Sequence, residues 1–318
     1  MKKTLFAIHL LLVGIGCAAF PSAALAQKPV LDSKTGSIST TDAPMLAGTA
    51  TLLSAWPAEE AGQGAAIDED HFYAVVNTRI GKYDRATGQR ISQWSSPRGG
   101  PIIHINSCYA NTRQLFCAHS NFPEIPMASS IEIFDTATMT HAGTHSLGLM
   151  DEGSLTFFDK IDGGWIAGFT HYDEKGGVGF KKSEYSSVIV FDEAWRRTGG
   201  WLIPDSIRSR MAPHGASGGA IGNDGWLYLM GHDLPEIYVV GKPKMGGSLV
   251  HITTFGIAAE GQALAFERGS SRRMVAISRP NREVRHFELP AAPQTIDTAV
   301  KFVGSQHPAV GEVFRPAE

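Results

Sequence analysis

"GGAIGNDGWLYLMGHDLPEIYVVGKPKMGGSLVHITTF", residues 218–255, contains four short apolar segments separated by polar turns. A small, Gly-rich segment comes first, and a Gly-His-Asp-Leu-Pro-Glu link joins the second segment to the third. Short apolar runs bounded by Gly, Asn, Asp and Pro are typical of β-strands. The stretch therefore predicts four consecutive strands.

The same order recurs along the chain with a period of about 45 to 55 residues. The other units lie at 62–94, 104–147, 153–203 and 261–289. In three units the third strand ends in an aromatic residue followed by Asp, namely Tyr83-Asp84, Phe134-Asp135 and Phe191-Asp192. Repeated four-stranded units of this length are typical of β-propellers. We therefore expect an all-β, five-bladed propeller with four-stranded antiparallel blades.

The fifth unit lacks an outer strand. The segment "TATLLSAWP", residues 49–57, resembles the outer strand "RISQW", residues 90–94, and is expected to close the ring by pairing with the last blade. A six-bladed propeller is the alternative, in which "TIDTAVKFVG", residues 295–304, contributes to a further blade. The propeller would form one domain over 46–318, and the polar residues 27–45 are expected to be a disordered lead-in.

The first 26 residues resemble a secretory signal peptide. Lys2 and Lys3 precede an apolar run at 5–19, and Ala24-Leu25-Ala26 forms a small-residue cleavage site. The mature protein is expected to be periplasmic or secreted. A lipoprotein anchored through Cys17 is the alternative, although Gly14 stands where leucine is usual in such signals. No later stretch is long and apolar enough to span a bilayer.

The charge pattern gives no indication of a nucleic-acid partner. The chain has 28 Lys and Arg against 31 Asp and Glu, a formal net charge of −3, which becomes −5 once Lys2 and Lys3 are removed. No basic block stands out, whereas nucleic-acid binding requires a clustered positive surface. We expect a small-molecule partner; the oligomeric state remains open.

Two cysteines, Cys108 and Cys117, remain in the mature chain, in "SCYANTRQLFC". If residues 112–113 form the tip of a hairpin, the two cysteines face each other across its strands, and an oxidising compartment favours a disulfide. Two small buried apolar side chains are the alternative. The same register places Asn106 opposite His119.

The segments "HSNFPE" (119–124), "SSIEIFD" (129–135), "GHDLPEIYVV" (231–240) and "EGQALAF" (260–266) resemble secreted bacterial propellers of the broad lactonase-like and SMP-30-like superfamily. The resemblance implies the propeller fold. The superfamily includes lactonases, cyclases, lyases and binding proteins, so the resemblance implies no single activity. The acidic metal ligands usual in SMP-30-like lactonases have no position-by-position match in this chain.

Polar residues stand where a propeller delivers side chains to one mouth of its central channel. In each blade the first strand begins, and the second strand ends, on the same face of the disc. Strand starts carry Gln63, His104, Asn106, Glu152, His214, Glu260 and Gln262, and strand ends carry Asn77, His119, His171 with Tyr172, His232 and Arg279. A polar insertion, residues 173–185, is expected to overhang the same mouth as a lid or a loop.

These residues suggest three roles. His104, His119 and His232 are candidate metal ligands, because imidazoles suit Zn, Mn, Fe or Ni better than Ca. Candidate catalytic residues are His171, His214, Tyr172, Glu152 and Glu260, with a histidine acting as general base if no metal is bound. Candidate substrate-binding residues are Gln63, Asn77, Asn106, Gln262 and Arg279. No organic cofactor is indicated.

The sequence thus predicts an exported lyase, hydrolase or cycloisomerase, metal-assisted or histidine-driven, acting on a small oxygen-rich substrate such as a sugar acid or a lactone. The alternative is a non-catalytic periplasmic propeller that binds a ligand or a protein. A purely structural role would need a sticky outer surface, and no exposed apolar run of that kind stands out in the sequence.

Overall fold

The computed structural model describes residues 46–303, apart from 112, 268, 270 and 271, and two short strands that precede them. These strands, β1 (Val30–Leu31) and β2 (Ile38–Ser39), pair with each other inside the expected lead-in. The predicted signal peptide, with Cys17, and the rest of the lead-in lie outside the described residues.

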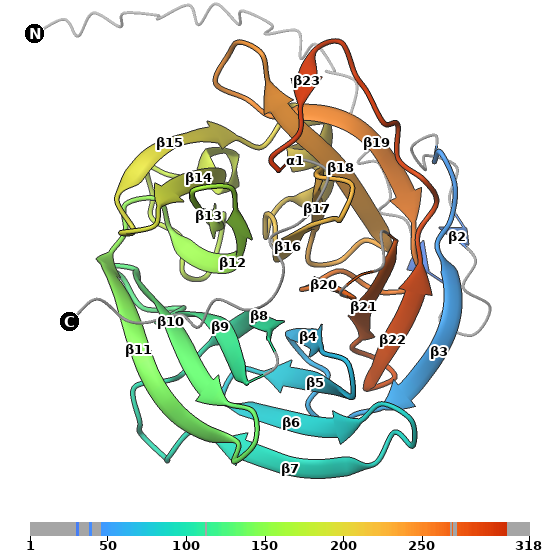
Figure 1. The fold of residues 1–318 in the computed structure, drawn as a ribbon. Coiled ribbons are helices and arrows are strands. Elements are labelled where there is room, and N and C mark those ends of the chain that lie inside the picture. Colours follow the sequence, from blue (N-terminus) through green and yellow to red (C-terminus); the bar gives the residue numbers. More distant parts are fainter. Residues whose placement is uncertain are drawn as a thin grey trace, which may run out of the picture.

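Five four-stranded antiparallel sheets surround a central channel (Figure 1), which confirms the predicted five-bladed propeller. Blade I contains β4 (Gly64–Ile67), β5 (His71–Val76), β6 (Arg79–Asp84) and β7 (Arg90–Ser95). Blade II contains β8 (Ile105–Ala110), β9 (Gln114–Ser120), β10 (Ala128–Asp135) and β11 (Thr140–Leu149). Blade III contains β12 (Ser154–Ile161), β13 (Gly164–Thr170), β14 (Ser187–Asp192) and β15 (Arg197–Leu202).

Blade IV contains β16 (Gly218–Ile221), β17 (Leu227–Met230), β18 (Glu236–Pro243) and β19 (Val250–Gly256). Blade V contains β20 (Ala265–Phe266), β21 (Arg273–Ser278), β22 (Glu283–Glu288) and, as its outer strand, β3 (Thr51–Pro57). A 3₁₀ turn (Ser183–Tyr185) and α1 (Asp205–Met211) are the helical elements of the described chain. No helix there has the length and hydrophobicity that crossing a bilayer requires.

The ring closes as the sequence predicts. β3 pairs antiparallel with β22, with Trp56 opposite Val284, so a strand from the start of the domain completes its last blade (Figure 1). The six-bladed alternative is wrong: β23 (Ala299–Val300) pairs with the end of β18 and adds an edge to blade IV. The two-residue β23 is too short to form a further four-stranded blade.

The inner strands are buried and the outer strands are half exposed. β4 and β17 are buried at every position, whereas β7 and β11 alternate between exposed and half-buried residues. Inner strands lie between two neighbouring blades and therefore bury both faces, which explains why their sequences are apolar throughout. This packing is the main stabilising contribution, since burial of apolar surface drives folding.

The disulfide between Cys108 and Cys117 is present, and the two cysteines face each other across β8 and β9 as predicted. The predicted register is wrong at Asn106, two residues before Cys108. A bulge between Ile105 and Cys108 places Ile105, and not Asn106, opposite His119. An extra residue in one strand turns the side chains beyond it to the opposite face. Asn106 and His119 therefore face different sides of blade II.

Candidate functional site

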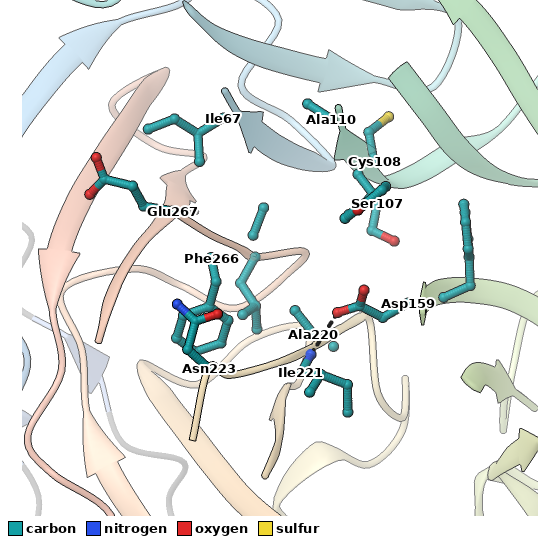
Figure 2. A pocket seen from close by; sticks show the side chains of 15 residues that line it. Ile67, Ser107, Cys108, Ala110, Asp159, Ala220, Ile221, Asn223, Phe266 and Glu267 are labelled. Carbon is teal, nitrogen blue, oxygen red and sulfur yellow. Dashed lines mark hydrogen bonds between the residues drawn. The ribbon is translucent and has the colours of Figure 1, made fainter. Parts of the chain in front are cut away.

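The two ends of the central channel differ in the space that they leave. Figure 2 shows the end at which the innermost strands finish, near Ile67, Ala110 and Ile221. The cavity there has a volume of about 50 Å³, enough for one or two waters. Two carboxylates line it. Asp159 accepts the backbone N–H groups of Ile221 (2.7 Å) and Lys160 (2.8 Å), and Glu267 pairs with Arg85 and His286. This end is narrow, and neighbouring groups already hold both of its acidic side chains.

The other end, where the innermost strands begin, contains a pocket of about 220 Å³. All five blades contribute to its lining. The polar lining residues are Gln63, His104, Asn106, Thr156, His214, Ser217, His232 and Gln262, and the walls are formed by Phe122, Tyr172, Glu174, Lys175 and Pro213. We call it the mouth pocket. Glu174 and Lys175 come from the start of the 173–185 insertion, which therefore reaches this mouth, whereas Lys181 and Tyr185 of the same insertion line a hollow beside blade III.

Seven of the thirteen candidate residues line the mouth pocket: Gln63, His104, Asn106, Tyr172, His214, His232 and Gln262. Three others lie directly behind it. Asn77 accepts a hydrogen bond from Gln63 (2.9 Å), Glu260 accepts one from Ser278 (3.3 Å), and Arg279 donates to His232.

The remaining three candidates lie elsewhere. His171 and Glu152 line a separate hollow beside blade III, where Glu152 forms an ion pair with Arg197. His119 points into a hollow on the side of blade II that faces blade I, where its Nδ1 contacts Ser130 (2.9 Å). Glu152 precedes β12 and His171 follows β13, and their side chains, like that of His119 on β9, line hollows other than the mouth pocket.

Asp233 organises the two histidines of blade IV. Its Oδ1 accepts from Nδ1 of His232 (2.7 Å), its Oδ2 accepts from Nδ1 of His214 (3.0 Å), and the two imidazole rings lie 4.1 Å apart. These two hydrogen bonds hold the pKa of the Asp233 carboxyl far below its usual range. A carboxylate can only accept, so each neutral imidazole carries its proton on Nδ1 and leaves a lone pair on Nε2.

The two Nε2 atoms have different surroundings. Nε2 of His232 lies 3.2 Å from Nη1 of Arg279. Arg279 also donates through Nη2 to the backbone carbonyl oxygen of His232 (2.6 Å). Burial lowers the pKa of His232, and Arg279 adds to that effect. Nε2 of His214 has no hydrogen-bond partner among the described residues, and its side chain is 39% exposed. His214 is thus the histidine of this pair that is free to react.

Local backbone structure positions this group. Met211, at the end of α1, accepts backbone hydrogen bonds from His214 and Gly215 (3.1 and 3.0 Å), which fixes the loop that carries His214. Gly261 has a φ of +76° and packs directly on the His232 loop; a Cβ there would lie 2.4 Å from the carbonyl oxygen of Gly231. Gln262 follows with a φ of +71°, an uncommon conformation for a residue with a side chain.

The opposite wall is aromatic and uncharged. Phe122 packs against His104 (ring centroids 4.9 Å apart) and against Tyr172 (4.7 Å). Burial, with a smaller contribution from His119, lowers the pKa of His104 to about 4, and burial raises that of Tyr172 to about 12. Both side chains are therefore neutral near pH 7 and act on a ligand as hydrogen-bonding or packing groups.

His214, His232 and Asp233 also form the one group of described residues whose ligand atoms lie close enough to hold a metal ion, within 4.8 Å of one another. Two imidazoles and a carboxylate match the three protein ligands of many catalytic zinc sites. Arg279, with Nη2 3.9 Å from Asp233 Oδ1, opposes a second positive charge at this position. The donor set fits a divalent ion, and the neighbouring guanidinium weakens that fit.

The sequence interpretation did not name Asp233 as a site residue. It also did not place Ser217, Thr156 or Phe122 in the site. Asp233 follows His232 directly in "GHDLPE", and a carboxylate beside a strand-end histidine was the signal available. Nothing in the sequence shows that Asp233 also contacts His214, because these two residues are 19 positions apart and meet only through the fold.

Comparison with known proteins finds no matching family model and no matching curated sequence. Among solved structures, the chain is similar to Kuenenia stuttgartiensis hydrazine synthase, with 11% identity and a TM-score of 0.38, over 70% of this chain and 63% of that one. It is similar to a chain of the mitotic checkpoint complex (9%, TM-score 0.43, 80% and 96% covered) and to U3-55K (11%, TM-score 0.39, 69% and 92% covered). Thus it spans less than two thirds of the hydrazine synthase chain.

Proposed function

We propose that this protein is an exported enzyme in which His214 acts as a general base in the mouth pocket. The observation that carries the proposal is the Asp233–His214 pair: the carboxylate accepts the Nδ1 proton, and Nε2 has no partner among the described residues. An imidazole held in this tautomer by a carboxylate is well placed to remove a proton from a substrate or from water.

The remaining lining residues define the class of substrate. Gln63, Asn106 and Gln262 offer amide groups, and His104, neutral near pH 7, offers a further hydrogen-bonding group. Phe122 and Tyr172 offer an apolar wall. A pocket of about 220 Å³ suits a small molecule. We infer a small, oxygen-rich cyclic substrate, a lactone or a sugar acid, and a hydrolase, lyase or isomerase reaction.

Two features of the sequence support the same proposal. The leader at 1–26 supports export to the periplasm or the medium, where the Cys108–Cys117 disulfide would be stable. The resemblance to lactonase-like and SMP-30-like propellers supports a channel-mouth site and a substrate of this class, although no acidic ligand set of the SMP-30 type is matched.

The test is a substrate screen followed by variants. A panel of lactones and sugar acids would be incubated with the mature protein and followed by proton NMR. For any substrate that turns over, Asp233→Asn and His214→Gln should each lower kcat by about 100-fold or more, since general-base catalysis contributes about 10²–10⁴. The asparagine variant retains the shape of the side chain but loses the charge that sets the tautomer.

His71→Gln is the matched control. His71, the first residue of β5, also pairs with an aspartate, Asp68 in the turn before it (3.2 Å), outside the mouth pocket. Its activity should equal that of the wild type. If His214→Gln retains full activity, the general-base role is wrong. If no panel member reacts while one of them still raises the Tm through His214, the protein is a binding propeller without catalysis.

A metal-assisted reaction is the second candidate, favoured by the three ligand atoms of His214, His232 and Asp233. A divalent ion bound there would polarise a substrate carbonyl. Elemental analysis of chelator-free protein would show one equivalent in the wild type and in His119→Ala, and none in His232→Ala. Metal-free wild-type protein with full activity would exclude this candidate and leave the general-base mechanism.

A further inference from the structure

A second hollow, of about 550 Å³, lies between blades I and II, away from the mouth pocket. Its wall comes from blade I: Trp94, near the end of β7, and the following loop with Pro97, Pro101 and Ile102. Its floor is one face of blade II. Ligand pockets commonly have volumes of about 300–1,000 Å³, so the hollow can hold a small organic molecule.

The floor is polar on a sheet face that usually packs against apolar side chains. Ser130 on β10 pairs with His119 on β9 and with Ser146 on β11, and its neighbour on the same face, Glu132, pairs with Thr144. Residues two apart in a strand point the same way, so these side chains form a continuous stripe across three strands. Its inner members His119, Ser130 and Glu132 are buried, whereas Thr144 and Ser146 on β11 are exposed. Buried polar groups lower stability unless they are hydrogen-bonded.

Two hydroxyls of this stripe and the imidazole of His141 point towards one carboxylate. Glu132, with a side chain only 3% exposed, accepts from Ser130 Oγ (2.6 Å), Thr144 Oγ1 (2.6 Å) and His141 Nε2 (2.8 Å). Ser130 Oγ in turn lies 2.9 Å from Nδ1 of His119. Because the protons of Thr144 and Ser130 are directed inward, their oxygens present only lone pairs to a molecule in the hollow. These two oxygens therefore favour a hydrogen-bond donor in the hollow.

The charge of the hollow points the same way. Glu132 is the only carboxylate among the lining residues, and none of them is Lys or Arg. Arg98 belongs to the same loop as Pro97 but does not line the hollow. Trp94 and the prolines make the opposite wall apolar. An acceptor floor, a single negative charge and an apolar wall together match an amine that carries a hydrophobic group.

We propose that the hollow between blades I and II is a binding site for small organic cations, namely primary amines with an aromatic or aliphatic body. The ammonium group donates to Thr144 and Ser146 above the Glu132 carboxylate, and the body packs on Trp94 and the prolines. The site is separate from the mouth pocket and does not depend on the proposed catalysis.

Isothermal titration calorimetry with three probes of one shape tests this proposal: phenethylamine, 2-phenylethanol and 3-phenylpropionate. The amine should bind the wild-type protein at least tenfold more tightly than the alcohol, and the acid should not bind. Glu132→Gln should weaken amine binding at least tenfold by removing the charge. Ser146→Trp, which fills the hollow from an exposed position without touching the Glu132 network, should abolish it.

Two controls locate the binding. Thr198→Trp introduces the same side chain at an exposed position of the outer strand of blade III and should leave amine binding unchanged. His214→Gln alters the mouth pocket and should also leave it unchanged. Equal binding of amine and alcohol, no amine binding at millimolar concentration, or binding that survives Ser146→Trp but is lost in His214→Gln would each overturn the proposal.

Discussion

Single residues at the mouth pocket are held by contacts with residues far away in the sequence. Asp233 orients His232 as its chain neighbour and His214 through space, and Arg279 from blade V approaches His232 from behind. Each of these contacts removes one nitrogen or oxygen from the set that can react. The two histidines therefore differ in their chemistry. Nε2 of His214 can accept a proton from a substrate, whereas Nε2 of His232 contacts Arg279.

His104 should make the protein less stable in mild acid. Its pKa in the folded protein is about 4, whereas the ordinary value is about 6.5. Between about pH 6.5 and 4, the unfolded chain binds a proton at His104 and the folded protein does not. The contribution of neutral His104 to the free energy of unfolding is therefore complete above about pH 6.5 and is lost as the pH falls towards 4. The contribution is about 3 kcal/mol at most.

Urea unfolding between pH 7.5 and 4 checks this prediction on the wild type and on His104→Gln. The difference in free energy of unfolding between the two proteins should shrink as the pH falls, because the glutamine does not titrate. Other buried histidines contribute equally to both proteins and cancel. Parallel pH profiles for the two proteins would show that His104 is not held neutral by the fold.

At the level of elements, the β8–β9 hairpin joins the disulfide to the mouth pocket. Cys108 and Cys117 lie directly opposite each other, and the bulge after Ile105 then turns Asn106 towards the channel and leaves His119 on the other face. One hairpin thus supplies side chains to both hollows. Nε2 of His119 also accepts the N–H of Ile103 (3.1 Å), next to His104, so the two hollows share a wall.

Removing the disulfide should lower the free energy of unfolding by about 2–3 kcal/mol, since it closes a short loop of about ten residues. Cys108→Ala with Cys117→Ala would be compared with the oxidised wild type by urea unfolding. Reduced wild-type protein should behave like the double variant. A midpoint that does not change on reduction would show that the packing of blade II alone holds the hairpin.

At the level of the whole molecule, β3 closes the ring. It covers β22, whose other edge pairs with β21, and Trp56 at its end stacks on Phe72 of blade I with ring centroids 4.7 Å apart. β3 thereby joins blade V to blade I. Without it, β22 would expose an unpaired edge, which promotes aggregation.

A chain that begins at residue 58 should therefore lose cooperative unfolding or aggregate. A synthetic peptide of residues 46–57 added in trans should restore the cooperative transition, because it supplies the missing strand. A peptide of the same composition in scrambled order is the control. A truncated chain that unfolds with an unchanged midpoint would show that closure contributes little to stability.

Much of the architecture was predictable because it depends on local sequence patterns. Strand length, turn residues and a repeat of four segments indicated five blades, and the likeness of 49–57 to an outer strand indicated the closure. The starts of first strands and the ends of second strands also identified seven residues of the mouth pocket. Only the six-bladed alternative fails, because the segment considered for a further blade forms a two-residue strand that pairs with blade IV.

The sequence by itself determined the number of blades, the closing strand, the cysteine pair and the end of the channel that is rich in histidine, because each of these depends on periodicity or spacing along the chain. Only the tertiary structure decided which side chains share a pocket. A single bulge in β8 separated His119 from Asn106, and the approach of two loops joined Asp233 to His214. The direction of a side chain depends on strand register and on neighbouring blades, and neither is encoded by the residue type alone.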